Sequence, residues 1–162
     1  MKKYPNIKVI SKPTEWLPDN FLKATLDVVG SQPIDAIYAH SDSVGTTAIL
    51  SALEQLGKKI PRDKEGHIFL ATIDGSPTGL DAIRQGFQDM CASQPCTDFG
   101  MIVNYIALEF EGGKIQEGPV VKEGALWSPA KIVMSDSGPM LNLATTIVTP
   151  DNVDDKRLWG NF

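Results

Sequence analysis

Short apolar runs alternate with amphipathic stretches along the first two thirds of this chain, and this alternation constrains the fold more than any other feature. Runs rich in aliphatic and β-branched residues predict strands at Ile7–Ile10, Ile34–Ala39, His67–Ile73 and Met90–Ser93. Helical spacing of apolar residues fills the intervals between them. Strands and helices joined by connections this short form right-handed βαβ units. The sequence therefore predicts an α/β fold built on a doubly wound parallel sheet.

The predicted helices begin and end at residues with suitable capping chemistry. Proline, aspartate or serine stands at each start and glycine at each end, in the order Pro18 to Gly30, Asp42 to Gly57 and Ser76-Pro77 to Gly86. A further helix with apolar residues from Phe99 to Phe110 is expected after a cap at Thr97, with a stop at Gly112-Gly113. Beyond it prolines punctuate the chain, and only Ile147–Thr149 predicts a strand.

Composition and charge narrow the function classes. The chain is 42% hydrophobic and 22% charged, which is ordinary for a globular protein and unlike a disordered one. Its formal net charge of −5 disfavours nucleic acid as a partner, because a phosphate backbone is bound by cationic surfaces. Its apolar runs are too short to span a bilayer, so no membrane insertion is expected.

Cysteine and histidine are scarce. The two cysteines, Cys91 and Cys96, and the two histidines do not follow metal-ligand spacing, so neither a metal nor a cofactor is expected. In an extended chain the two cysteine Cα atoms would be about 16 Å apart, which is beyond disulfide reach. Both thiols are expected to be unpaired unless the chain bends at Pro95. The N-terminus has no apolar region after its lysines, so no signal peptide is expected in this chain.

Polar and aromatic residues follow each predicted strand. They are Trp16, Ser41 with Asp42, Asp74 and Gln94. In open parallel sheets, ligands bind beyond the carboxyl ends of the strands. Carboxylates and amides form hydrogen bonds with hydroxyl groups, and an aromatic ring packs on an apolar C–H face. The set therefore suits a neutral polyhydroxylated ligand.

Other interpretations of the same residues stay open. Asp42 is more easily read as a helix N-cap than as a ligand contact, and Asp74, Trp16 and Gln94 could be turn, core and loop residues. Enzyme readings are weaker. The loop Ile73–Gly79 lacks the lysine of a phosphate-binding loop, and Ser41 lacks the glycine-flanked elbow of a nucleophilic serine.

Five ordered motifs resemble one family. In order they are Tyr4–Val9, Ala39–Gly45, Ile73–Pro77, Ala92–Pro95 and Ile147–Val153. They resemble the carboxy-terminal part of the periplasmic sugar-binding proteins of ABC transporters, of the ribose- and galactose-binding type. The resemblance implies a solute-binding protein without catalytic activity, located in the periplasm, with a monosaccharide or polyol ligand. It also implies an ABC permease as partner of the full-length protein.

The resemblance also assigns residue roles. It implies that Trp16 stacks on the sugar ring and that Ser41, Asp42, Asp74 and Gln94 bind ligand. Ser41 departs from the family pattern, in which an asparagine precedes the aspartate. A hydroxyl reaches less far than an amide, so the contact at this position is expected to differ from the family's.

Mapped on this family, the chain divides into three parts. Residues 1–94 correspond to part of the C-terminal lobe of a Rossmann-like, incomplete fold. Residues 95–146 correspond to a hinge crossing and a segment of the N-terminal lobe, and residues 147–162 to a return strand and tail. The family's central strand is then missing, and a slot in the sheet is expected. We accordingly expect association with the missing lobe or with a second copy of the chain.

Two rival functions remain. The effector-binding domain of a lac-repressor-type regulator shares the fold, but the chain has no helix-turn-helix and its third strand is followed by Asp74-Gly75 instead of an aspartate pair. A small α/β enzyme using the strand-end aspartates Asp42 and Asp74 is the second alternative.

Overall fold

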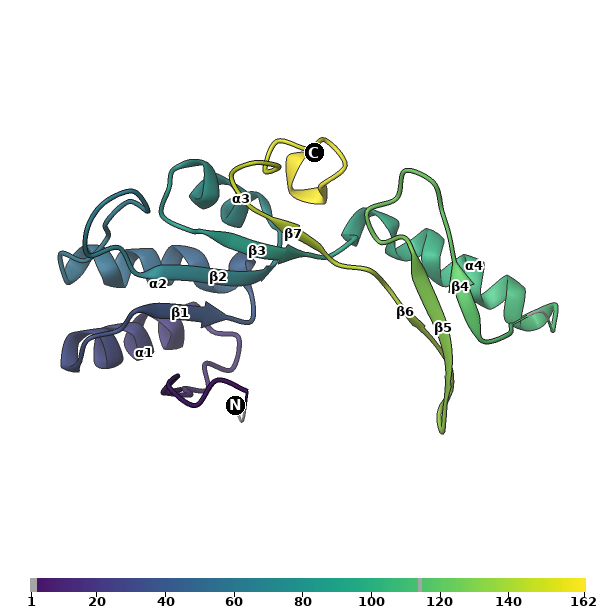
Figure 1. The fold of residues 1–162 in the computed structure, drawn as a ribbon, viewed down its shortest axis with the longest axis horizontal. Helices are drawn as coiled ribbons and strands as arrows, with labels where there is room; N and C mark the ends of the chain where they lie inside the picture. The colour runs from purple at the N-terminus through teal and green to yellow at the C-terminus, as the bar shows by residue number, and fades with distance from the viewer. Residues whose placement is uncertain (1–2, 114) are drawn as a thin grey trace.

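The computed structural model describes residues 3–113 and 115–162, which form two units joined by two chain crossings (Figure 1). The larger unit, which we term the α/β unit, contains α1 (Pro18–Ser31), β1 (Ala36–Ala39), α2 (Asp42–Gln55), β2 (Phe69–Asp74), α3 (Pro77–Arg84), β3 (Met90–Ser93) and β7 (Thr146–Val148). The smaller unit contains a short 3₁₀ turn (Cys96–Asp98), α4 (Phe99–Glu111), β4 (Gly118–Val120), β5 (Ala130–Ser135) and β6 (Gly138–Asn142). A final 3₁₀ turn, Trp159–Asn161, ends the C-terminal tail.

The main sheet confirms the predicted α/β class. Its strand order is β1-β2-β3-β7; β1, β2 and β3 are parallel, and β7 runs antiparallel to β3. The predicted strands at residues 34–39, 67–73, 90–93 and 147–149 therefore form, with small shifts at their ends. The strand predicted at Ile7–Ile10 was wrong. Among the described residues it has no neighbouring strand to hydrogen-bond with, and Ile7, Val9 and Ile10 are exposed.

The expected slot is not inside the sheet. All four strands are hydrogen-bonded neighbours, so the sheet is continuous. The free backbone groups lie instead along the outer edges of β1 and β7, since each of these strands is paired with a single strand among the described residues. The sequence order could not locate these edges, because strand neighbours are decided by tertiary pairing.

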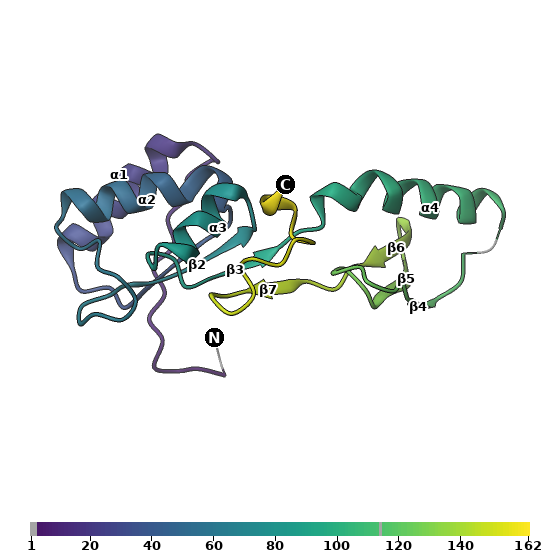
Figure 2. The ribbon, with the colours of Figure 1, turned by 90° about the horizontal axis from the view of Figure 1, so that it is seen from above.

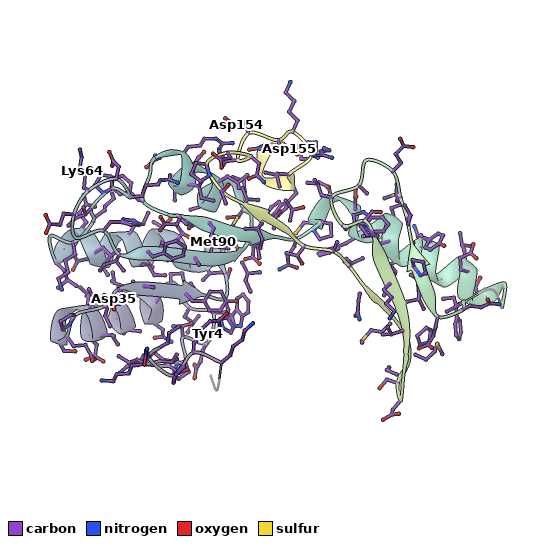
Figure 3. The ribbon with its side chains drawn as sticks, in the orientation of Figure 1. Tyr4, Asp35, Lys64, Met90, Asp154 and Asp155 are labelled. Atoms are coloured by element: carbon purple, nitrogen blue, oxygen red, sulfur yellow. The ribbon has the colours of Figure 1, made fainter. Side chains whose placement is uncertain are left out.

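Helices cover only one face of the main sheet in the described part of the chain. α1, α2 and α3 lie side by side on that face (Figure 2). Side chains alternate between faces along a strand, and the register places Leu70, Cys91 and Val148 on the helix-covered face, where each is 0% exposed. We term the opposite surface the open face. It carries Tyr38, Phe69 and Ile147, which are 59%, 43% and 47% exposed, and also Met90 (Figure 3).

Several helix ends differ from their predicted caps. α1 begins at Pro18 as predicted but continues past Gly30 to Ser31. Ser41, not Asp42, is the N-cap of α2, and α4 follows the 3₁₀ turn with Asp98, not Thr97, at its N-cap. The cap at Ser76 is confirmed, since its hydroxyl accepts the Gly79 N–H at 3.2 Å.

The smaller unit was largely missed by the sequence pattern. Pro119 in β4 and Pro139 in β6 interrupt the alternation that identifies a strand, and the six-residue β5, which contains no proline, was missed as well. Its core is small, with Ile102, Trp127 and Ala130 buried at the centre. α4 therefore remains exposed elsewhere, and Val103, Leu108 and Phe110 are each more than 60% exposed, with the lowest at 62%.

Both cysteines are free, as predicted. Cys91 is buried in β3, and this burial raises the pKa of its thiol to about 12. Among the described residues, no helix is both long and apolar enough to cross a bilayer.

Candidate functional site

Four polar side chains meet beyond the carboxyl ends of β1, β2 and β3, and we term them the strand-end cluster: Ser41, Ser43, Asp74 and Gln94. The Asp74 carboxylate is their centre. Its Oδ2 accepts the hydroxyls of Ser41 at 2.6 Å and Ser43 at 2.8 Å, and its Oδ1 accepts Gln94 Nε2 at 2.8 Å. The sequence predicted three of these residues as one group, and the parallel strands do bring them together.

The backbone of Asp74 has an unusual conformation. Its φ of 111° is rare for a residue with a side chain, and such conformations persist only where surrounding contacts hold them. Two donors hold the Asp74 carbonyl, the Gln94 N–H at 2.9 Å and the indole N–H of Trp159 at 2.7 Å. The next residue must be glycine. Gly75 has φ 75°, and a Cβ there would lie 2.6 Å from Ser93 Oγ.

Asp42 lies beneath this turn and not at its surface. It is 0% exposed, and its carboxylate accepts the N–H groups of Gly75 at 2.8 Å and Ser76 at 3.1 Å. Burial raises the pKa of Asp42, partly opposed by hydrogen bonds from Ser76 and Gly75. Its side chain is therefore neither the predicted N-cap nor open to a ligand in this conformation. It ties the start of α2 to the turn that follows β2.

Trp16 is the residue expected to stack on a sugar ring. It lies in the loop before α1, it is 62% exposed, and Glu15 and Trp16 have successive positive φ angles of 50° and 59°. The strained turn presents the ring to solvent, so the alternative core role is wrong. No hydrogen bond joins Trp16 to Asp74 or Gln94 in the described part of the chain, and its position beside them stays a prediction.

The four side chains of the strand-end cluster differ in their accessibility to a ligand. Ser41 is 0% exposed, whereas Ser43 and Gln94 are exposed and Asp74 is half-buried. An ionised carboxylate offers about four acceptor positions, and protein donors use three at Asp74. The accessible chemistry is therefore one remaining carboxylate acceptor, the Ser43 hydroxyl and the Gln94 amide.

A cavity of about 380 Å³ lies at the junction of the two units. It is lined on one side by Gln94 and Pro95, and on the other by residues of the smaller unit, Trp127 among them. Its volume is in the range of small-molecule sites. Gln94 thus belongs both to the strand-end cluster and to the wall of this cavity.

Sequence reasoning missed two residues of this region. Ser43 lies two residues after Ser41 on the first turn of α2. The motif Ala39–Gly45 includes it, but the sequence pattern did not predict it to bind ligand. Trp159 is distant in sequence from Asp74, and only tertiary packing brings its indole to the turn. No periodicity or motif could have signalled that contact.

A sequence profile described as the periplasmic binding protein domain matches residues 1–115. The chain belongs to the periplasmic binding protein family. The family consists of solute-binding proteins and not of enzymes. Comparison with curated protein sequences found no relative.

Solved structures share the periplasmic binding protein fold. A solute-binding protein from Actinobacillus succinogenes with bound D-allose is 19% identical over 95% of this chain and 46% of its own, with a TM-score of 0.66. A Bacillus halodurans protein with bound myo-inositol is 19% identical over 96% of this chain and 45% of its own, with a TM-score of 0.66. An Agrobacterium vitis protein with bound D-fucose is 15% identical over 93% and 43%, with a TM-score of 0.66. The chain thus spans less than half the length of each of these structures.

Proposed function

We propose that this chain is the ligand-contacting part of a sugar- or polyol-binding component of an ABC transporter, acting in the periplasm. The observation that carries the proposal is the strand-end cluster, in which Asp74 and Gln94 present polar groups beyond parallel strands. Membership of the periplasmic binding protein family supports it. So do the ligands named for similar folds, which are monosaccharides and a cyclitol.

The exposed groups suit ligand hydroxyls. A sugar hydroxyl can donate to the free acceptor position of Asp74 or to the Ser43 oxygen, whose own proton is donated to Asp74. It can accept from the second N–H of the Gln94 amide. The exposed Trp16 ring supplies an aromatic face for the C–H side of a sugar ring. Asp42 and Ser41 act from below, because both are buried and hold the turns that carry the exposed groups.

The smaller unit completes the proposal. Residues 95–146 would form a segment of a second lobe, and the two crossings beside Gln94 and before β7 would be hinges between lobes. The missing lobe or a second copy of the chain would then cover the exposed apolar side of α4. Ligand contacts from one lobe alone give weak binding, because closure of a second lobe adds contacts and excludes water. Delivery to an ABC permease would require the whole protein.

Calorimetric and NMR titration with D-allose, D-fucose and myo-inositol tests the proposal. We expect weak but saturable binding of at least one of the three. Asp74→Asn should weaken it roughly 10- to 100-fold, since a hydrogen bond to a charged group is worth about 1.5–3 kcal/mol. Asp136→Asn is the matched control, because this substitution removes the same charge from the exposed β5–β6 turn.

The outcome of these titrations is decisive in either direction. Saturable binding that Asp74→Asn weakens and Asp136→Asn leaves unchanged supports the site. Binding that is equally strong in both variants would place the ligand elsewhere. Failure of the wild-type chain to bind any of the three at high sugar concentration would refute the proposed function for this chain.

A further inference from the structure

The C-terminal tail covers the back of the Asp74 turn. The indole N–H of Trp159 donates to the Asp74 carbonyl at 2.7 Å. The following Gly160 lies so close that a Cβ there would collide with the carbonyl oxygen of Gly75. The tail and the turn are 85 residues apart in sequence, so this fit depends on how the tail is anchored.

The tail is anchored firmly on α3. Val153 and Leu158 are buried at 4% and 1% exposure in a cluster with Leu80 and Ile83. Arg84 adds polar links, with Nε donating to Asp154 at 2.8 Å and Nη2 donating to the Asn161 side chain and the Val153 carbonyl. Figure 3 shows Asp154 and Asp155 on the tail at the top of the α/β unit. The packing of the tail on α3 therefore holds the Trp159 indole in place independently of its hydrogen bond to Asp74.

The contact acts on the part of Asp74 that is strained. A φ of 111° is maintained only by surrounding groups, and the two donors on the Asp74 carbonyl are the backbone N–H of Gln94 and the side chain of Trp159. The direction of the carbonyl and that of the side chain are set together by the backbone angles of one residue. Loss of the indole bond thus leaves the carboxylate less well aimed at Ser43 and Gln94.

We propose that Trp159 is a positioning residue for ligand binding, through which the C-terminal tail holds the Asp74 carboxylate in its binding geometry. The proposal rests on the proposed function for its effect on sugar affinity. Its structural part, the fixing of the Asp74 turn, stands independently of any ligand. The C-terminal tail thereby affects ligand affinity although it lies outside the strand-end cluster.

Trp159→Phe tests the proposal, because it keeps an aromatic ring and removes the N–H. We expect the dissociation constants for D-allose, D-fucose and myo-inositol to rise roughly 3- to 10-fold, with a fall in the unfolding midpoint no larger than the loss of one hydrogen bond causes. Trp127→Phe is the matched control. It removes another indole N–H, which donates to Asp98 at 2.7 Å in the smaller unit, and it controls for amide exchange at Gly75. Thr25→Val removes a buried hydrogen bond within α1 and should leave sugar affinity unchanged.

Two NMR readouts separate positioning from a merely structural role. In the ligand-free chain, the amide of Gly75 should exchange faster in Trp159→Phe than in wild type or Trp127→Phe. On addition of sugar to the wild type, the Trp159 indole resonance should shift, since its acceptor belongs to the ligand-binding residue. The two tryptophan variants assign the indole resonances.

Unchanged Gly75 exchange together with unchanged sugar affinity in Trp159→Phe would overturn the inference. A chain that binds none of the sugars but shows faster Gly75 exchange in this variant would refute the proposed function and keep the positioning of the turn. Loss of affinity with a drop in the unfolding midpoint much larger than that of Thr25→Val would also count against it, since that pattern marks general destabilisation.

Discussion

The two faces of the main sheet are built from similar residues but have different surroundings. The helix-covered face carries Leu70, Cys91 and Val148, all 0% exposed beneath α1, α2 and α3. The open face carries Tyr38, Phe69 and Ile147, each between 43% and 59% exposed. The side chains of the two faces are equally apolar, so residue type alone does not separate them. The difference lies in the layer above, which is present on one side only in the described residues.

This difference shows what an apolar strand pattern does and does not determine. The near-continuous run at residues 67–73 predicts a strand buried on both faces, as in a sheet with two helical layers. In the structure one face of that strand is open. The apolar pattern therefore indicates that both faces suit burial, although one is exposed in this chain. The open face is a candidate contact surface for another polypeptide.

Neighbouring residues of β2 give the sharpest test of the two faces. Leu70 is 0% exposed on the helix-covered face, and Phe69 is 43% exposed on the open face. We expect Leu70→Ala to lower the free energy of unfolding by about 2–5 kcal/mol, because it removes buried contacts and leaves a cavity. Phe69→Ala should cost about 1 kcal/mol or less, since its ring is half-exposed in the monomer.

Urea denaturation at low protein concentration measures both values. Low concentration is needed because association would bury Phe69 and enlarge its apparent contribution. Equal losses for the two variants would show that the open face is covered in solution. The contrast between the faces would then be wrong for the protein in solution.

Asp42 gives the next effect, on the helix-covered side of the site. Burial raises its pKa in the folded chain above the ordinary value of 3.8. A raised folded pKa means that the folded chain binds this proton more tightly than the unfolded chain does. The Asp42 contribution to stability is thus fully present below about pH 3.8 and declines as the pH rises through the folded pKa.

Unfolding free energies of wild type and Asp42→Asn, measured from pH 3 to pH 7, test this sign. Asp42→Asn should be less stable throughout. The Gly75 and Ser76 N–H groups bond different carboxylate oxygens, and asparagine replaces one of these oxygens with an NH2 group that cannot accept. Its disadvantage should shrink as the pH rises, since only the wild type carries the buried charge. The other carboxylates are the same in both proteins, so their effects largely cancel in the difference. A disadvantage that grows with pH would contradict the raised pKa.

Much of the fold could be predicted because its signals are local. The strand at Met90–Ser93 and the helix start at Pro18 were found from residues within a few positions of each other. The Ile7–Ile10 strand failed because β-branched residues favour an extended chain but cannot supply the neighbour that a strand needs. Strands β4 and β6 were not predicted, because each contains a glycine and a proline that interrupt the alternation of apolar and polar residues.

The candidate site divides in the same way. Ser41, Asp74 and Gln94 were predicted together because parallel strands bring their carboxyl ends to one edge. Asp42 was misread because its neighbours in sequence suggest a cap, whereas its partners Gly75 and Ser76 come from the next βα turn. Trp159 reaches Asp74 only through the packing of the tail on α3, which the sequence does not signal.

The smallest effect on stability, and the most informative for the open face, is expected from Phe69→Lys. Its β2 position on the open face should tolerate a long side chain that extends into water, at a cost within roughly 1 kcal/mol in the monomer. If the open face mediates association, a buried ammonium should weaken that association roughly 10-fold.

Ser137→Lys, in the exposed β5–β6 turn, makes the same change to the net charge of −5 and controls for charge. Sedimentation of the three proteins over a concentration series measures the effect: we expect wild type and Ser137→Lys to associate alike and Phe69→Lys to remain monomeric longer. Identical association of all three would exclude the open face as the contact, and would leave the exposed side of α4, with Val103 and Leu108, as the surface that brings chains together.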